Sequence, residues 1–474
     1  MTLPTLGIDA YQLTTLLTHA DEGRLDHDVS MAFFFRRMPK HRNFVLVAGL
    51  TRILAHAAQL AIAPEEIEAL LRHSALGPAL RARPAVVERL RALSGFAGAI
   101  DAMPEGSVAF AGPASRTDGS PFLLGGAPFS IYTPILQVKT DMLRAKLIET
   151  PWLGFFNHMS MVASKAARVV LAARGKSVME FGQRRTHPAA ALDATYAAWV
   201  AGISATSNIG AYVKWGVTAT GTMDHFAVQA SERPGQSRAA SEREFFAAYQ
   251  KTYDGLPTTM LVDTYDTEQG IAHAVQAAGS TLGAVRLDSN VTKETIARAR
   301  EQLVELGAPD AKIFVSDGLD EHRVAELAEL ADGFGIGENI VCSPDSSVGV
   351  GAVAKLVVNG YGAITMKVAR GTGKATLPGE LQVYRYADHD LVALASEPAP
   401  GGGSRAMLGP VWRGTAPVDP KPEAAALEAA RVHAASEMLA LPEDLKALDR
   451  ASPRKLVASD ALVRQIERLV AEAA

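Results

Sequence analysis

The stretch "GAVRLDSNVTKETIARAREQLVELGAPDAKIFVSDG", residues 283–318, predicts one strand–helix–strand unit. Two short apolar segments, 283–289 and 311–318, both end in polar residues. The run between them, 291–306, places apolar residues at the three- and four-residue spacing of a helix. Strands that alternate with helices in this way are typical of parallel βα units, so the stretch predicts an α/β fold.

The same alternation continues on both sides, from about residue 131. Further strand-like segments lie at 176–182, 216–225, 258–266 and 333–340. Six such segments in one run favour a (β/α) barrel, in which the active site lies at the carboxyl ends of the strands. Such ends are often polar merely because the chain enters water, but several polar ends together favour one shared cleft. The polar residues at or near these ends are Glu180, His225, Asp263, Asp266, Arg286, Asp288, Ser316 and Asp317.

Composition excludes several classes of protein. A chain of 474 residues is too long for one simple core, so we expect more than one structural unit. Its net charge of −4, without a basic tract, argues against nucleic-acid binding. No apolar run is long enough to span a membrane, and the N-terminus lacks a signal-peptide pattern. A single cysteine, Cys342, excludes a disulfide framework and fits a reducing cytoplasm. The histidines lack the spacing of metal ligands, so we expect no metal site held by protein residues alone.

Outside the alternating region, residues 1–130 mix helix-like and strand-like segments. Residues 391–420 are rich in proline and glycine, which is typical of an irregular surface segment. The tail that follows is helical in pattern and broken at proline. Near the last strand-like segment, Gly335 and Gly337 would let backbone N–H groups approach a phosphate, and Gly318 would do the same one strand earlier. An ordinary tight turn would account for these glycines equally well.

A series of motifs resembles the nicotinate phosphoribosyltransferase family. The motifs stand in the family's order from about residue 7 to residue 385, and their joint order makes the resemblance specific. They are "GIDAYQLT" (7–14), "FFFRRMPKHRNFVLVAGL" (33–50), "LIETPWLGFFNHMSMVASKAARV" (147–169), "EFGQRRTHP" (180–188), "SATSN" (204–208), "GTMDH" (221–225), "LVDTYDT" (261–267), "VRLDS" (285–289), "FGIG" (334–337) and "KATLPGELQVYR" (374–385).

The resemblance implies a type II phosphoribosyltransferase, an irregular α/β barrel with an outer α+β domain built from both chain ends. We expect the outer part at 1–130, the barrel at 131–364, and a return to the outer domain with a helical tail at 365–474. The family joins nicotinate to phosphoribosyl pyrophosphate (PRPP) in NAD salvage, giving nicotinate mononucleotide and pyrophosphate. The resemblance also implies Mg²⁺, ATP that phosphorylates a histidine, and a homodimer with a shared active site.

The resemblance also implies residue roles. His225 matches the phosphorylatable histidine, and a nearby carboxylate can fix the tautomer of its ring. Asp263 and Asp288 resemble acids near that histidine; one would orient it, and the other would bind ribose hydroxyls or Mg²⁺. Thr222 and Tyr11 resemble nicotinate contacts, with Tyr11 reaching the site of a neighbouring subunit.

Further residues match positions on the two sides of the substrates. Phe181 would stack on the pyridine ring, although simple core packing would also account for it. Arg286 would lie on the other face of that ring or pair with the nicotinate carboxylate. Arg184 and Arg185 suit phosphate, and a structural ion pair is the alternative for Arg184. Ser207 stands where the nicotinamide-using relative has an aspartate, which favours an acid over an amide as substrate.

The chain departs from the family mainly on the expected phosphate side. "LDSNV" (287–291) replaces LDSGD, Glu338 replaces the threonine of GIGT, "LPGEL" (377–381) lacks the usual basic residues, and "GGAPFSIYTPILQVKT" (125–140) differs from the family text. A carboxylate beside a phosphate costs free energy unless a cation or an arginine bridges it. Two alternatives therefore stay open: a diverged transferase for another base or donor, and a catalytically silent homologue that binds a nucleotide or a protein.

Overall fold

The computed structural model describes residues 5–38, 42–342, 351–369, 374–449 and 453–473. The chain forms two compact units. We call Val162–Ser346 the barrel unit, and Met1–Met161 together with Ser347–Ala474 the outer unit. The boundaries expected at residues 130 and 364 stay predictions. Residues 39–41 of the motif at 33–50 lie outside the described ranges.

The barrel unit contains one sheet of six parallel strands in the order β11-β10-β15-β14-β13-β12. Strands β12 to β15 are neighbours in chain order, and β15 then pairs with β10, so the sheet curls back on its first strand. The order ends at β11 and β12, which makes the sheet an open half-barrel. The predicted irregular barrel is therefore confirmed. The strands are β10 Ser177–Glu180, β11 Ala205–Thr206, β12 Thr258–Leu261, β13 Leu282–Leu287, β14 Lys312–Val315 and β15 Gly333–Ile336.

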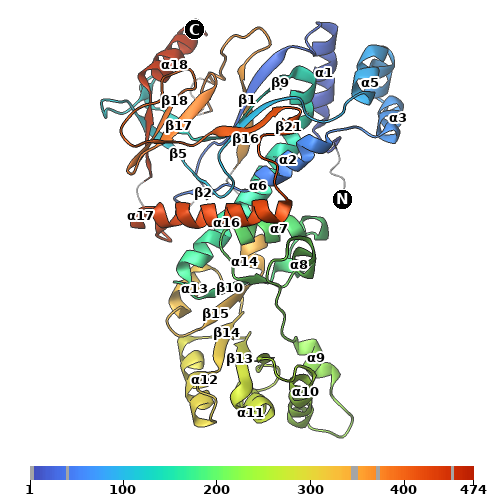
Figure 1. The fold of residues 1–474 in the computed structure, drawn as a ribbon, viewed down its shortest axis with the longest axis vertical. Coiled ribbons are helices and arrows are strands. Elements are labelled where there is room, and N and C mark those ends of the chain that lie inside the picture. Colours follow the sequence, from blue (N-terminus) through green and yellow to red (C-terminus); the bar gives the residue numbers. More distant parts are fainter. Residues whose placement is uncertain (1–4, 39–41, 343–350, 370–373, 450–452, 474) are drawn as a thin grey trace. The chain divides into compact units, whose positions relative to one another are not determined.

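Helices follow these strands as the sequence pattern predicts. Helix α11 packs against β12 and β13, and α12 packs against β14 (Figure 1). Asp266, Thr292 and Asp320 cap α11, α12 and α13 by accepting backbone N–H groups, so each helix begins soon after a strand ends. The helices are α7 Pro188–Val200, α8 Ile209–Trp215, α9 His225–Ala230, α10 Arg238–Thr252, α11 Thr267–Ala278, α12 Lys293–Glu305, α13 Glu321–Leu327 and α14 Glu338–Val341, with short 3₁₀ turns η1 Gly182–Arg184 and η2 Gly279–Thr281.

The strand expected at 216–225 is wrong. This segment makes a single parallel bridge, Thr206 with Ala219, and then runs on without sheet pairing into α9. Gly216 ends α8 in the left-handed region, with φ of 72°, which turns the chain away from an extended path. Because the segment lies beside β11 at the open side of the sheet, it has no strand partner on its other side among the described residues.

The outer unit holds two six-stranded sheets, in the orders β16-β1-β9-β3-β20-β21 and β19-β17-β18-β22-β5-β8. Strand β1 is buried along nearly its whole length, as its run of three phenylalanines predicts. The strands are β1 Asp28–Phe35, β2 Val45–Leu46, β3 Gly98–Ala102, β4 Val108–Ala109, β5 Ala111–Ser115, β6 Leu123–Leu124, β7 Ala127–Pro128, β8 Ser130–Tyr132, β9 Pro134–Asp141, β16 Ala352–Val358, β17 Leu381–Arg385, β18 His389–Leu394, β19 Arg405–Ala406, β20 Gly409–Gly414, β21 Ala416–Pro417 and β22 Lys455–Ala458.

Helices of the outer unit come from both ends of the chain. Helix α6 begins in this unit and ends in the barrel unit, and α18 packs beside β18 (Figure 1). The helices are α1 Ala10–Asp21, α2 Leu50–Gln59, α3 Pro64–Arg72, α4 Leu76–Arg81, α5 Pro84–Arg91, α6 Met142–Ala172, α16 Glu423–Ala440, α17 Glu443–Lys446 and α18 Asp460–Glu472.

One expectation for the C-terminal region is wrong, and a second is incomplete, because the tail holds the helices α16, α17 and α18 but also a strand. The segment 391–420 is no irregular linker, because it supplies most of β18 and all of β19, β20 and β21. Trp412 in β20 is buried, so this glycine- and proline-rich stretch still carries a core side chain. The helical tail contains a strand, β22, which pairs in parallel with both β18 and β5. Its run of apolar residues, LVA, is too short to separate from a helical pattern by periodicity.

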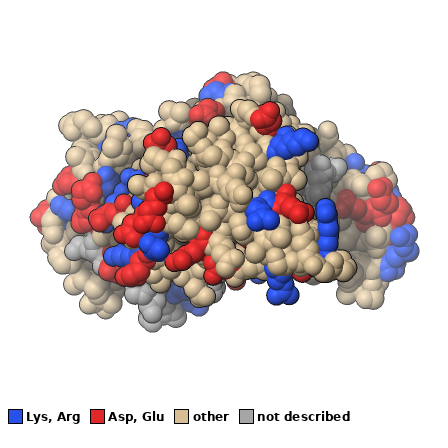
Figure 2. All heavy atoms as spheres, turned by 90° about the horizontal axis from the view of Figure 1, so that it is seen from below, with Lys and Arg blue, Asp and Glu red and all other residues tan. Residues whose placement is uncertain are grey.

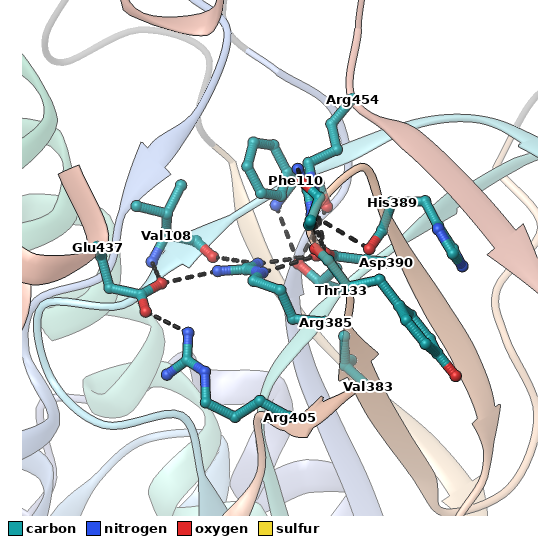
Figure 3. A network of polar contacts seen from close by, with 12 residues as sticks. Val108, Phe110, Thr133, Val383, Arg385, His389, Asp390, Arg405, Glu437 and Arg454 are labelled. Atoms are coloured by element: carbon teal, nitrogen blue, oxygen red, sulfur yellow. Dashed lines mark hydrogen bonds and ion pairs between the residues drawn. The ribbon is translucent and has the colours of Figure 1, made fainter. Parts of the chain in front are cut away.

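A buried ionic network joins parts of the C-terminal segment of the outer unit and reaches the N-terminal segment through the Val108 carbonyl, which accepts from Arg385 at 2.7 Å (Figure 3). Asp390 is fully buried and accepts from Arg385 at 3.0 and 2.8 Å and from Arg454 at 3.1 Å. Glu437 accepts from Arg385 at 2.8 Å and from Arg405. Each buried carboxylate thus has at least two guanidinium partners, which offsets the cost of removing its charge from water.

The surface shows mixed charge. On the face in Figure 2, acidic and basic side chains lie interspersed in small groups among uncharged residues. In the part of the chain that the structure describes, no helix is both long and apolar enough to cross a bilayer.

Candidate active site

His225 is the first residue of α9, and Asp224 caps that helix. The Asp224 Oδ1 atom accepts the backbone N–H of Ala227 at 2.9 Å, which is the usual bond of an N-cap aspartate. The acid of "MDH" is therefore a helix cap, and the histidine that follows it is the residue at which the helix begins. Its imidazole is half-buried.

The His225 ring lies between two residues from neighbouring strand ends. Its Nδ1 atom lies 3.1 Å from the hydroxyl of Thr264, which follows β12. Its Nε2 atom lies 3.5 Å from Oδ2 of Asp288, which follows β13. The structure thus brings His225 and Asp288 together as predicted. The hydroxyl contact is the one that sequence reasoning missed, although Thr264 stands inside the "LVDTYDT" motif.

The two acids of the cluster are linked through the backbone. Asp263 Oδ2 accepts the N–H of Asp288 at 2.7 Å, and Ser316 donates to Asp288 Oδ1 at 2.6 Å. Burial raises the pKa of the Asp263 carboxyl, while the Asp288 N–H and the nearby His225 act in the opposite direction. Asp263 Oδ1 is buried and has no hydrogen-bond partner among the described residues. This oxygen is available to receive a cation or a substrate hydroxyl.

Arg286, on β13, has an unused donor. Its Nη1 donates to the Thr222 hydroxyl at 2.7 Å, but its buried Nε has no hydrogen-bond partner among the described residues. Burial lowers the pKa of this guanidinium, whereas Asp288 and Asp263 raise it. Tyr249 of α10 donates to the backbone carbonyl of Thr222 at 3.1 Å. No local sequence signal marks Tyr249, because it reaches this loop only through the packing of α10.

Phe181 and the late glycines form one packed corner. Phe181 is half-buried, and a Cβ added at Gly335 would collide with its ring. A Cβ added at Gly337 would lie 3.0 Å from the Phe181 carbonyl oxygen. Both glycines therefore have a packing reason, and their contact with phosphate stays a prediction. Gly318 has φ of 53°, a left-handed turn conformation that favours glycine.

Glu338 pairs with an arginine that was expected to bind phosphate. Its Oε2 lies 3.7 Å from Nε of Arg185, and the two side chains are 60% and 61% exposed. Arg184 is also exposed, and it lies near enough to Arg286 to influence its pKa. The Glu338 carboxylate thus pairs with one of the two arginines that were predicted to bind phosphate.

The "LDSNV" departure keeps the backbone geometry that a glycine would allow. Asn290 has φ of 51°, and asparagine is among the residues that tolerate this left-handed region. Val291 is buried, and its N–H donates to Asp317 Oδ2 at 2.9 Å. The change removes an acid, and Asn290 adopts a left-handed conformation that glycine would also favour.

Glu180, another polar strand end, has a structural task. It is fully buried, and its carboxylate accepts from Gln183 at 2.9 Å and from Thr206 at 2.7 Å. Its carbonyl accepts the N–H of Ser207, which is half-buried. The Glu180 carboxylate therefore holds neighbouring segments of the barrel unit together. Tyr11 lies on α1 in the outer unit and is 51% exposed.

The comparison with protein families identifies two matches. Residues 6–116 match the family described as the nicotinate phosphoribosyltransferase (NAPRTase) N-terminal domain. Residues 176–365 match the nicotinate phosphoribosyltransferase (NAPRTase) family. The second match contains the whole cluster around His225.

Curated relatives carry the same family name. A nicotinate phosphoribosyltransferase of Mycobacterium tuberculosis, pncB1, is 36% identical over 334 residues, covering 70% of this chain and 68% of the relative. A second one from the same organism, pncB2, is 31% identical over 98% of this chain and 93% of the relative. The crystal structure of human nicotinic acid phosphoribosyltransferase covers 97% of this chain and 99% of its own, with a TM-score of 0.74 at 24% identity. That likeness shows the same fold.

Proposed function

This chain belongs to the nicotinate phosphoribosyltransferase family, and from that premise we propose that it joins nicotinate to PRPP, giving nicotinate mononucleotide and pyrophosphate in NAD salvage. The observation that carries the proposal is the position of His225 between Thr264 and Asp288, with Asp263 bound to the same strand end. Mere binding of a nucleotide has no chemical need for this set.

Arg286 is the proposed partner of the nicotinate carboxylate. Its buried Nε lacks a hydrogen-bond partner among the described residues, and a guanidinium binds a carboxylate through parallel N–H groups. Thr222, which already accepts from Arg286, would contact the same end of the substrate. Phe181 would stack on the pyridine ring. Ser207 carries no negative charge, whereas an aspartate at this position would repel an acid substrate. Nicotinate is therefore favoured over nicotinamide.

PRPP is the proposed donor, bound by Arg184 and Arg185 together with the backbone at Gly318, Gly335 and Gly337. Phosphate is well matched by arginine forks and by backbone N–H groups. For Arg185 to bind phosphate, its ion pair with Glu338 must break, or a cation must bridge the Glu338 carboxylate and the phosphate.

Mg²⁺ fits the carboxylates that the cluster offers. The described residues contain no group of three metal-ligating side chains, and Mg²⁺ is commonly held by one or two carboxylates together with substrate phosphates. Asp263, with its unpartnered Oδ1, and Asp288 would hold the ion. Bound there, it would neutralise charge on the departing pyrophosphate.

His225 is the proposed site of phosphorylation by ATP. A neutral ring nitrogen would attack the γ-phosphorus, forming an N–P bond as the P–O bond to ADP breaks. Hydrolysis of the phosphohistidine would then drive product formation forward. The half-buried ring supports this role, because a nucleotide must reach it.

A homodimer in the cytoplasm completes the proposal. Helix α8 exposes an apolar face, Ile209, Tyr212 and Val213, at helical three- and four-residue spacing. Exposed apolar faces of this kind favour protein contacts. Tyr11, itself half exposed, would enter the site of the neighbouring subunit. The single cysteine suits a reducing compartment.

The direct test is turnover by the purified full chain with nicotinate, PRPP and Mg²⁺, with and without ATP. We expect nicotinate mononucleotide, more of it with ATP, and loss of the ATP effect in His225→Ala. The matched control is His322→Ala, at an exposed position on α13.

No product from nicotinate with a folded protein would reject the function. Product from nicotinamide or from another donor would support a diverged transferase, for which Glu338 is the motivating departure. PRPP binding without turnover would support the silent homologue.

A further inference from the structure

Thr264 is the hydrogen-bond partner of the His225 ring among the described residues. Its hydroxyl lies 3.1 Å from Nδ1, whereas Asp288 lies 3.5 Å from Nε2, beyond the usual range of about 2.7–3.2 Å. We propose that Thr264 is a positioning residue whose hydroxyl fixes the orientation of the His225 ring. This inference rests on the proposed catalytic role of His225.

The hydroxyl is presented from a backbone that is held at both ends. Asp263, the residue before Thr264, accepts the N–H of Asp288 at 2.7 Å and so ties the turn to the next strand. Asp266, two residues after Thr264, caps α11 by accepting the N–H of Gln269 at 2.9 Å. A short turn fixed on both sides leaves Thr264 little freedom to move away from the ring.

A hydroxyl can hold the neutral ring in either tautomer, because it can accept from Nδ1–H or donate to Nδ1. When Thr264 accepts from Nδ1–H, the lone pair of Nε2 is left free to attack phosphorus. The Thr264 hydroxyl therefore holds the plane of the ring without engaging both of its nitrogen atoms.

Two alternative roles for these side chains lead to different experimental results. In one, Thr264 only fills space through its methyl group; in the other, Asp288 orients the ring without help. Valine keeps the branched shape and removes the hydroxyl, and serine keeps the hydroxyl and removes the methyl group. The pair Thr264→Val and Thr264→Ser therefore separates hydrogen bonding from packing.

The experiment compares these variants in the full-length protein. It measures nicotinate mononucleotide formed per ATP hydrolysed, and it records ¹⁵N NMR of the histidine ring, assigned to His225 by its absence in His225→Ala. We expect Thr264→Val to lower ATP-coupled turnover about tenfold and to shift the ¹⁵N signal of Nδ1, which loses its hydrogen-bond partner. Thr264→Ser should stay close to wild type in both readouts. Thr281→Val, whose hydroxyl bonds the Ala278 carbonyl at 2.6 Å, is the control.

Two results would overturn the inference. One is a Thr264→Val protein with wild-type coupling and an unchanged ring signature. The other is an equal loss in Thr264→Ser, which would assign the effect to packing. Thermal unfolding confirms that each variant is folded, and Thr264→Ala replaces the valine variant if that one does not fold. If the wild type makes no nicotinate mononucleotide, the proposed function fails, but the NMR comparison still decides the positioning role.

Discussion

The side chain of Asp263 accepts the backbone N–H of Asp288 at 2.7 Å, so the acid that follows one strand fixes the acid that follows the next. One carboxylate oxygen of Asp263 is used in this bond, and the other is buried without a hydrogen-bond partner among the described residues. Asp263 is therefore both a structural acceptor and an available ligand, and substitutions can separate these two roles.

Asp263→Asn should stabilise the protein while it lowers activity. Burial raises the pKa of the Asp263 carboxyl, so the folded state binds its proton more tightly than the unfolded chain does. Stability is then lost as pH rises from the unfolded pKa, about 3.9, through the raised folded value. Asparagine carries no such charge and can still accept from Asp288. We expect a higher Tm than wild type at pH 7 and no difference below about pH 4. The exposed Asp310→Asn is the control, and a lower Tm for Asp263→Asn at pH 7 would contradict the argument.

Glu338→Thr should improve use of the phosphate donor. The substitution frees Arg185 from its ion pair and removes a negative charge from the phosphate side. Because both side chains are largely exposed, we expect a modest effect, a KM for PRPP about two- to fivefold lower. Steady-state kinetics should show an unchanged KM for nicotinate. Glu329→Thr, which breaks the exposed pair with Arg174, should leave both constants unchanged. A higher KM for PRPP in Glu338→Thr would mean that the glutamate itself helps to bind the donor.

Tyr249→Phe should weaken nicotinate binding without slowing chemistry. The lost hydroxyl holds the Thr222 carbonyl, and Thr222 in turn accepts from Arg286. One neutral hydrogen bond is worth about 1 kcal/mol, so the KM for nicotinate should rise about fivefold while kcat stays the same. Tyr253→Phe serves as the control. It removes the hydroxyl of the adjacent tyrosine, whose ring centroid lies 4.7 Å from that of Tyr249. Equal constants in the two variants would show that Tyr249 has no part in binding.

Asp390→Asn should destabilise the outer unit. The substitution leaves the guanidinium groups of Arg385 and Arg454 short of a buried charge partner (Figure 3). Removing one partner of a buried ion pair typically costs about 3–5 kcal/mol. Denaturant unfolding should report this loss. Asp388→Asn, at an exposed neighbour bonded to His389, should change the free energy of unfolding little. Similar values for both variants would show that the network contributes no specific stability.

Local patterns predicted the parallel half-barrel because short apolar strands alternate with helices there, and three of these helices, α11, α12 and α13, begin at a capping residue. The pattern misled at 216–225, since a strand also needs a partner on its edge, and the sheet is open there. It misled again at β22, where three apolar residues inside a helical tail join a sheet made by distant segments. Pairing over such distances leaves no mark in the local sequence.

Motif order predicted the members of the candidate site better than their surroundings. His225, Asp263 and Asp288 do lie together, but the ring's hydrogen bond comes from Thr264 and not from a carboxylate. The sequence does not identify Tyr249 as a member of the site, because its contact with Thr222 depends on how α10 packs. The loss of glycine at Asn290 looked like a change in the site, yet its φ of 51° lies in the left-handed region that glycine also favours.

The central place of β22 in its sheet has a consequence for how the protein is made. This strand lies between β18 and β5, so it joins a segment near residue 112 to one near residue 390. A ribosome delivers residues 455–458 after both of the strands with which they pair. The barrel unit, continuous from Val162 to Ser346, can therefore close during synthesis, whereas the outer unit must wait for its last strand. Until then, the edges of β5 and β18 that pair with β22 are open to wrong pairing.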